Sequence, residues 1–103
     1  MKFASLAVLA LVSTFTAPAF ANLELATKSQ CTACHAVDKK IVGPGFQEIA
    51  KKYKGTSDAQ TKLTESIRNG GSGKWGQVPM PAQPSLSEAD AKVLAAWVMS
   101  TAK

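Results

Sequence analysis

Apolar residues recur at helical spacing in several separate stretches of the chain. No stretch alternates apolar and polar residues as a half-buried strand does. The clearest helical stretch runs from Phe46 to about Tyr53, with apolar residues at i, i+3, i+4 and i+7 and Gly55 following as a stop signal. A shorter helix is predicted from Leu23 to Lys28. The pattern therefore predicts an all-α fold.

Two more helices are predicted toward the C-terminus. Asp58 is the expected N-cap of a helix that runs to about Arg68. The run Ser85-Leu86-Ser87-Glu88 has the pattern of a capping box, and the last helix is expected to continue from it to about Ala102. The apolar stripe of that helix is Val93, Leu94, Trp97 and Val98. About four helices are therefore expected.

Two loops separate these helices. Residues 38–45 include Gly43-Pro44-Gly45, a strong helix-breaking cluster. Residues 70–85 have no helical or strand period, with four glycines near the start and prolines at 79, 81 and 84. Loops of this length in compact domains are usually functional, so the second loop is expected to contribute to a site.

The first residues are typical of an export signal. Lys2 provides the positive start, Leu6–Val12 is the apolar run, and Ala19-Phe20-Ala21 has the small-x-small form of a cleavage site. An uncleaved membrane anchor is the alternative, which the short apolar run and the Ala-x-Ala ending disfavour. We expect a signal peptide at residues 1–21, cleavage after Ala21, and a periplasmic domain at residues 22–103.

The predicted mature domain is small and mildly basic. Removing Lys2 with the signal takes the formal net charge from +5 to +4. The aromatic residues beyond the signal are Phe46, Tyr53, Trp75 and Trp97. A domain with so few core residues is often stabilised by a disulfide, a metal or a cofactor. Basic and aromatic residues are not interleaved as on a nucleic-acid-binding surface, so no nucleic-acid partner is expected.

The pentapeptide Cys31-Thr32-Ala33-Cys34-His35 carries the most specific chemistry in the chain. A C-x-x-C-H run is the attachment pattern of a c-type haem. Two thiols at this spacing can form thioethers with the two vinyl groups of one porphyrin, and the histidine that follows is held beneath the iron. We expect one haem c on Cys31 and Cys34, with His35 as an iron ligand.

Two other uses of these residues stay open at this point. A C-x-x-C pair can be a redox-active dithiol, but the strands and crossover helices that accompany thioredoxin-like dithiols are not predicted here. Cysteine and histidine also bind structural zinc, which needs four ligands. The chain has only two cysteines and one histidine, so zinc would need a carboxylate or a water to complete its shell.

The second iron ligand must come from the remaining side chains. The mature chain has no other histidine, and its methionines are Met80 and Met99. Met99 stands at the end of the last predicted helix, where packing is its expected role. Met80 stands between Pro79 and Pro81, which hold the segment extended so that the thioether can project from the loop. Met80 is therefore the predicted ligand, as in His/Met cytochromes.

Ligation by His35 and Met80 predicts electron transfer. A neutral sulfur ligand favours ferrous iron and raises the reduction potential, and two protein ligands leave no open coordination position. We therefore expect a soluble, monomeric single-electron carrier that is not an enzyme. The alternative is a haem protein with an open iron site, such as a gas sensor or a small haem enzyme, which requires Met80 to be off the iron.

The order of these motifs resembles that of small bacterial class I cytochromes c of the cytochrome c-551 type. The resemblance is carried by the pentapeptide, Val42-Gly43-Pro44-Gly45-Phe46, Lys74-Trp75-Gly76 and Val78-Pro79-Met80-Pro81, and it covers essentially the whole mature chain. It implies four helices around one haem, with the first and last helices packed across each other. It also implies a respiratory-chain carrier between membrane cytochrome complexes and a terminal reductase, oxidase or peroxidase.

Further cofactor contacts are implied by the resemblance. The carbonyl of Pro44 would accept a hydrogen bond from the outer ring nitrogen of His35, and Trp75 would donate its indole N–H to a haem propionate. Ser66 stands where the family commonly has a basic residue that neutralises a propionate. Either Arg68 approaches the propionate from another direction, or the propionate is less well compensated.

Lysines dominate the charge of the mature chain, and most are expected to be ordinary solvated side chains. Lys39, Lys40 and Lys74 flank the predicted haem-bearing loops. We expect these three to steer encounters with acidic redox partner proteins.

Overall fold

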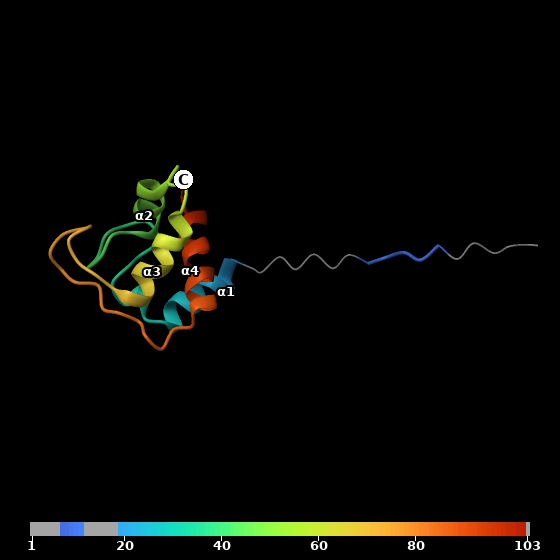
Figure 1. The fold of residues 1–103 in the computed structure, drawn as a ribbon, viewed down its shortest axis with the longest axis horizontal. Helices are drawn as coiled ribbons and strands as arrows, with labels where there is room; N and C mark the ends of the chain where they lie inside the picture. The colour runs from blue at the N-terminus through green and yellow to red at the C-terminus, as the bar shows by residue number, and fades with distance from the viewer. Residues whose placement is uncertain (1–6, 12–18, 103) are drawn as a thin grey trace, which may run out of the picture.

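The computed structural model describes residues 7–11 and 19–102. Its helices are α1 (Ala19–Lys28), the short 3-10 helix η1 (Cys31–Ala33), α2 (Phe46–Tyr53), α3 (Ala59–Asn69) and α4 (Glu88–Ser100). Two isolated β-bridges are the only strand-like pairings among the described residues. The all-α prediction is confirmed, with four α-helices in the expected order (Figure 1).

The described residues that precede α1 are extended and solvent-exposed. Val8, Leu9 and Leu11 are all exposed apolar side chains in residues 7–11. Most of the other residues of the predicted signal peptide, 1–21, lie outside the described part of the chain. α1 begins at Ala19, earlier than the predicted start at Leu23. None of the helices in the described residues is long and apolar enough to cross a membrane.

The core forms where α2, α3 and α4 pack together. Its buried cluster consists of Phe46, Ile49, Leu63, Ala95 and Val98. α4 is the central element, because it contacts α1, α2 and α3. The contact between the first and last helices is therefore present. Both helices have fully buried alanines, which allow a close approach of the two helix axes (Ala26, Ala91 and Ala95).

The start of α4 differs from the prediction. Ser87, not Ser85, is the N-cap, and its Oγ accepts a hydrogen bond from the Asp90 backbone N–H at 3.1 Å. The Leu86 N–H donates to the Gln83 carbonyl, which closes a turn with Pro84 in its second position. Ser85 lies inside this turn and is therefore not available as a cap.

The buried face of α4 is also shifted from the predicted stripe. Val93 is 44% exposed, whereas Ala91, Leu94, Ala95 and Val98 are buried at i, i+3, i+4 and i+7. The two alanines bring α4 close to its neighbours, and this rotates Val93 out of the core. α4 ends at Ser100, before the predicted Ala102.

The ends of α3 lie close to their predicted positions, but the cap is different. Asp58 is the N-cap residue without a side-chain hydrogen bond to the helix. Its carboxylate instead pairs with Lys62 at 3.3 Å, an exposed ion pair one turn along. The helix ends at Asn69, one residue beyond Arg68, and Gly70 with φ of +67° turns the chain away.

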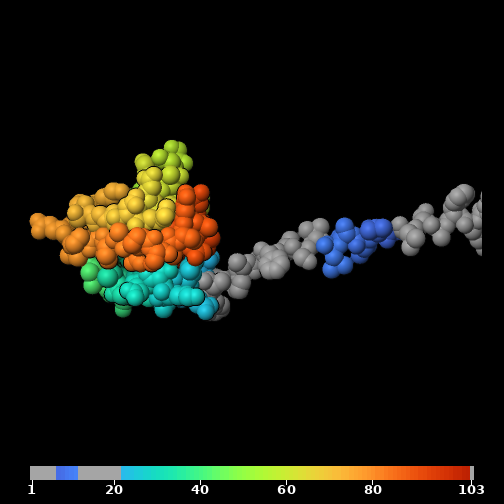
Figure 2. All heavy atoms as spheres, turned by 60° about the horizontal axis from the view of Figure 1, so that its bottom comes forward, coloured from blue at the N-terminus to red at the C-terminus, as the bar shows by residue number. Residues whose placement is uncertain are grey.

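Both predicted loops lie on one side of the helices. Figure 1 shows the 38–45 segment and the first part of the 70–85 loop (orange) on the side away from α1, and the loop then runs along the bottom of the view to α4. In the space-filling view the cyan N-terminal segments and the orange C-terminal segments meet along one face (Figure 2). The 70–85 loop brings Met80 to the same part of the fold as Cys31–His35.

Candidate functional site

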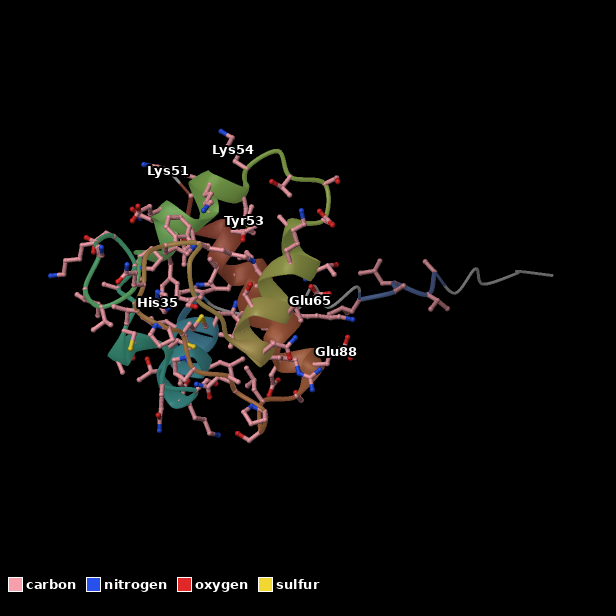
Figure 3. All side chains as sticks on the ribbon, turned by 60° about the vertical axis from the view of Figure 1, so that its left-hand side comes forward. His35, Lys51, Tyr53, Lys54, Glu65 and Glu88 are labelled. Atoms are coloured by element: carbon pink, nitrogen blue, oxygen red, sulfur yellow. The ribbon has the colours of Figure 1, made fainter. Side chains whose placement is uncertain are left out.

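His35 is buried and has one strong hydrogen bond. Its Nδ1 lies 2.6 Å from the carbonyl oxygen of Pro44. A carbonyl oxygen only accepts, so Nδ1 carries the proton and donates it. In a neutral imidazole this leaves the lone pair on Nε2, which is the state that can coordinate a metal. Figure 3 shows His35 inside the molecule, beneath the loops.

Backbone hydrogen bonds attach the histidine segment to α2. The carbonyls of Ala36 and Val37 accept from the N–H groups of Phe46 and Gln47 at 2.9 and 3.0 Å. The N-cap residue Gly45 has no side chain to satisfy these first-turn donors, so the segment after His35 does so. The position of the imidazole is therefore tied to the start of α2.

Two neighbours hold the plane of the His35 ring. The ring of Phe46 stacks on it with centroids 5.3 Å apart and an interplanar angle of 30°. Gly43 lies against the ring, and the Gly43 N–H donates to the Cys34 carbonyl at 2.7 Å. The sequence pattern predicts neither contact: it marks Gly43 and Phe46 as part of a family motif, Gly43 as a helix breaker and Phe46 as an apolar position of α2.

Cys31 and Cys34 are separate, partly buried thiols. The left-handed conformation of Gln30, with φ of +65°, ends α1 and turns the chain into η1, which carries Cys31. Burial raises the pKa of the Cys31 thiol above its ordinary value, and the neighbouring Cys34 adds to that shift. A thioether has no charged form, so this partly buried position suits an alkylated sulfur better than a thiolate.

The candidate residues line one cavity of about 300 Å³. Its wall is drawn from all four α-helices, from η1 and from both loops, and it is largely apolar. Among the predicted site residues it includes Cys31, Cys34, His35, Pro44, Trp75 and Met80. These residues are up to 49 positions apart in the sequence (Cys31 to Met80), and the fold brings them to one partly open cavity.

Backbone hydrogen bonds fix the position of Met80 in the 70–85 loop. It forms an isolated β-bridge with Gly71, in which the Met80 N–H donates to the Gly71 carbonyl at 2.7 Å and the Gly71 N–H donates to the Met80 carbonyl at 3.0 Å. Prolines on both sides leave Met80 as the sole N–H donor of residues 79–81, and this bridge uses it.

Gly70 allows the loop to close. A Cβ at Gly70 would collide with the Met80 carbonyl oxygen and would lie 2.8 Å from the Ala82 nitrogen. Its positive φ also favours glycine. The Gln83 N–H donates to the Arg68 carbonyl at 3.1 Å and ties the far end of the loop to α3. Gly70 is thus a further residue whose role the sequence pattern does not reveal.

Arg68 is not among the residues that line the cavity. Leu63, Ser66, Ile67 and Gly70 form the face of α3 that lines it, and Arg68 lies about 100° around the helix from Ile67. The Nε of Arg68 is buried with no hydrogen-bond partner in the described part of the chain. Ser66 is therefore the polar α3 side chain on the cavity wall.

The predicted lysines differ in their relation to the cavity. Lys40 and Lys74 line its rim, whereas Lys39 is exposed and does not line it. Val42 and Val78 also line the rim and are 52% and 67% exposed. Met99 does not line the cavity and packs against the buried cluster.

These donors fit the c-type haem expected from the pentapeptide. The cavity offers two thiols, an imidazole with its outer nitrogen already bonded, and a thioether, in a largely apolar wall. In the described residues no three His, Cys, Asp or Glu side chains gather where they could share a metal ion.

Comparison with known proteins assigns the family. Residues 23–102 match the cytochrome c family. Cytochrome c-552 of Nitrosomonas europaea is 49% identical over 80 residues, which cover 78% of this chain and 78% of that protein. Cytochrome c-551 of Azotobacter vinelandii is 51% identical over 77 residues, which cover 75% of this chain and 93% of that protein.

The fold agrees with this assignment. The crystal structure of wild-type Nitrosomonas europaea cytochrome c552 superposes with a TM-score of 0.75 at 48% identity, covering 77% of this chain and 98% of that one. The predicted resemblance to cytochromes of the c-551 type is therefore confirmed. The chain belongs to the cytochrome c family, as a small class I member that carries covalently attached haem c and acts as a haem-based electron carrier.

Proposed function

We propose that the protein is a periplasmic single-electron carrier, not an enzyme, whose iron is ligated by His35 and Met80. One observation supports this most directly. His35 and Met80 line the same cavity as Cys31 and Cys34, and each is fixed by backbone contacts of its own. When bound, haem supplies a reversible one-electron step between ferric and ferrous iron.

The chain's own residues set the conditions for that step. The Pro44 carbonyl keeps the proton on Nδ1 and makes the imidazole a stronger donor at Nε2. The sulfur of Met80 is neutral and soft, and together with the apolar wall it favours the less charged ferrous state. Trp75 lines the cavity, and we assign its indole N–H to a propionate. Ser66, also on the wall, replaces Arg68 as the second polar candidate.

Export to the periplasm is the proposed location, with the signal peptide at residues 1–21 removed after Ala21. The exposure of residues 7–11 supports this proposal, because even the apolar side chains of this segment are exposed to solvent. Their removal would cost the domain at residues 22–103 no buried contact from that segment. N-terminal sequencing of the secreted protein tests the cleavage, which is expected to leave Asn22 first.

Redox partners are proposed to dock at the rim of the cavity. Lys40 and Lys74 stand beside the exposed apolar residues Val42 and Val78 there. Such a surface suits short-lived complexes with acidic proteins: a membrane cytochrome complex as the donor, and a terminal reductase, oxidase or peroxidase as the acceptor.

The test of the ligand assignment is a visible spectrum of the dithionite-reduced protein with and without carbon monoxide. Sharp c-type bands that carbon monoxide leaves unchanged are expected from an iron with two protein ligands. A shift on adding the gas would overturn the Met80 assignment and favour an open-site sensor or enzyme.

A further inference from the structure

Lys52, in the last turn of α2, makes two contacts that cross to the 70–85 loop. Its Nζ lies 4.2 Å from the centroid of the Trp75 ring. The same Nζ donates a hydrogen bond to the carbonyl oxygen of Lys74 at 3.2 Å. An ammonium over the face of an indole is attracted by the ring quadrupole, and tryptophan is the best aromatic partner for this interaction. One exposed lysine therefore contacts two consecutive residues of the loop.

These contacts lie in the outer part of the loop, where no backbone hydrogen bond of the described residues joins the loop to α2. The loop is pinned at its base by the Gly71–Met80 bridge, and the Gly73 N–H closes a turn on the Gly76 carbonyl. Lys74 and Trp75 lie inside that turn, so Lys52 ties the outer part of the loop to α2. Lys52 has no carboxylate partner within the described residues, and its charge is directed to the ring and the carbonyl.

We propose that Lys52 is a positioning residue, which fastens the loop that carries Trp75 and Met80 to α2. It keeps the Trp75 ring at the cavity wall and reduces the opening of the loop away from the cavity. Its bearing on the iron rests on the proposed ligation by Met80, but its effect on the loop does not.

The chain offers a matched control one residue away. Lys51 is also exposed, on the same helix, and its ammonium makes no hydrogen bond or ion pair within the described residues. Figure 3 shows Lys51 pointing outward from α2. Lys51→Ala and Lys52→Ala thus remove the same charge from the same helix turn, and only the second removes the contact with the loop.

The experiment is amide hydrogen exchange, followed by NMR on the ferrous, haem-loaded protein. The amides of Gly71, Gly73 and Met80 report opening of the loop, because each makes a hydrogen bond within it. The amide of Leu94 in the core reports global unfolding. Lys52→Ala is expected to raise exchange of the three loop amides roughly fivefold, as expected for loss of an exposed cation–π contact and one hydrogen bond.

Three comparisons decide the proposal. In Lys52→Ala, the exchange rate of the Leu94 amide is expected to stay unchanged. In Lys51→Ala, the exchange rates of the loop amides are expected to stay within about twofold of the parent protein. Lys52→Arg is expected to keep the loop amides protected, since a guanidinium keeps both the charge and the hydrogen-bond donor. Equal exchange in Lys51→Ala and Lys52→Ala, or a common rise at all four amides, would overturn it. In a Trp75→Leu background Lys52→Ala should have a smaller effect, because the contact with the ring is already lost.

A second readout connects the loop to the iron. Imidazole binding to ferric protein requires Met80 to leave, so its rate should rise in Lys52→Ala by the same factor as loop exchange. If the parent protein binds carbon monoxide when reduced, the Met80 assignment fails, while amide exchange still decides whether Lys52 fastens the loop.

Discussion

Gly43 lies so close to His35 that a Cβ on it would stand 2.6 Å from Cε1 and 2.9 Å from Nδ1 of the imidazole. The glycine is therefore needed for space and not for an unusual φ. It lets the ring lie flat between the 36–45 segment and Phe46 while Nδ1 reaches the Pro44 carbonyl.

Gly43→Ala should displace the imidazole and weaken its hydrogen bond to Pro44. Overpacking of this kind costs about 1–3 kcal/mol of unfolding free energy. Loss of the hydrogen bond should also lower the basicity of Nε2 and change the reduction potential, measured by spectroelectrochemistry. Gly55→Ala is the control, because a Cβ there meets no atom within 4 Å although φ is +83°. Gly55→Ala should lower the unfolding free energy by about 1 kcal/mol and leave the reduction potential unchanged. An unchanged reduction potential in Gly43→Ala would contradict the proposed role of Gly43.

Met80→Ala should open the iron and lower its potential. Loss of a neutral sulfur ligand removes the preference for ferrous iron, and a fall on the order of 100 mV is expected within the roughly 0.8 V range that axial ligands span. Carbon monoxide should then bind the reduced variant. Met99→Ala is the matched control, since Met99 packs against the core and does not line the cavity. The assignment is wrong if Met80→Ala and Met99→Ala give the same potential.

Gln30→Gly should stabilise the protein. Gln30 has φ of +65°, a conformation that costs an L-residue about 1 kcal/mol relative to glycine. A gain of about 1 kcal/mol corresponds to a rise in Tm of about 4–8 °C in a domain of this size. Gln30→Val should shift Tm in the opposite direction, because β-branched residues tolerate positive φ least. Thermal unfolding followed by circular dichroism measures both, and equal Tm values would show that Gln30 is not strained.

Ser87→Ala and Ser85→Ala should differ in stability. Ser87 caps α4 through its contact with Asp90, and loss of such a cap costs about 1 kcal/mol. Ser85 lies in the preceding turn and should tolerate the same change with a loss of less than about 0.5 kcal/mol. Guanidinium chloride unfolding of the two variants separates them, and a reversed order would restore Ser85 as the cap.

Electron exchange with an acidic partner should slow as ionic strength rises. Lys40→Gln should reduce the second-order rate constant by roughly twofold at low salt, because it removes a charge from the cavity rim. Lys62→Gln removes the same charge away from the rim, where Lys62 pairs with Asp58, and should have little effect. Stopped-flow kinetics at several salt concentrations would refute the docking surface if both variants behave alike.

The predictions from the sequence are confirmed for features that a few neighbouring residues determine. α2 runs from Phe46 to Tyr53 as expected, because its apolar period is regular and glycine-rich segments adjoin it. The haem attachment pattern is equally local, and the family assignment agrees with it. Both are features of a few consecutive residues.

The errors concern residues whose position depends on distant partners. Ser85 matches a capping box, but it lies inside the turn that the Leu86 N–H and the Gln83 carbonyl close, so Ser87 is the cap instead. Val93 fits the apolar period of α4, yet the close approach made possible by Ala91 and Ala95 turns it toward solvent. Lys52 is one lysine among many in the sequence, and only the folded loop gives it a partner.

The Gly71–Met80 bridge has a consequence for how the loop could vary in length. The bridge sets the register of Met80 from the base of the loop. Residues 77–79 are exposed and lie between the bridge and the turn at Gly73–Gly76. Insertions before Pro79 would change the outline of the proposed docking surface, while the Gly71–Met80 bridge keeps its hold on the Met80 backbone. Partner choice and iron ligation can therefore diverge independently within one short segment.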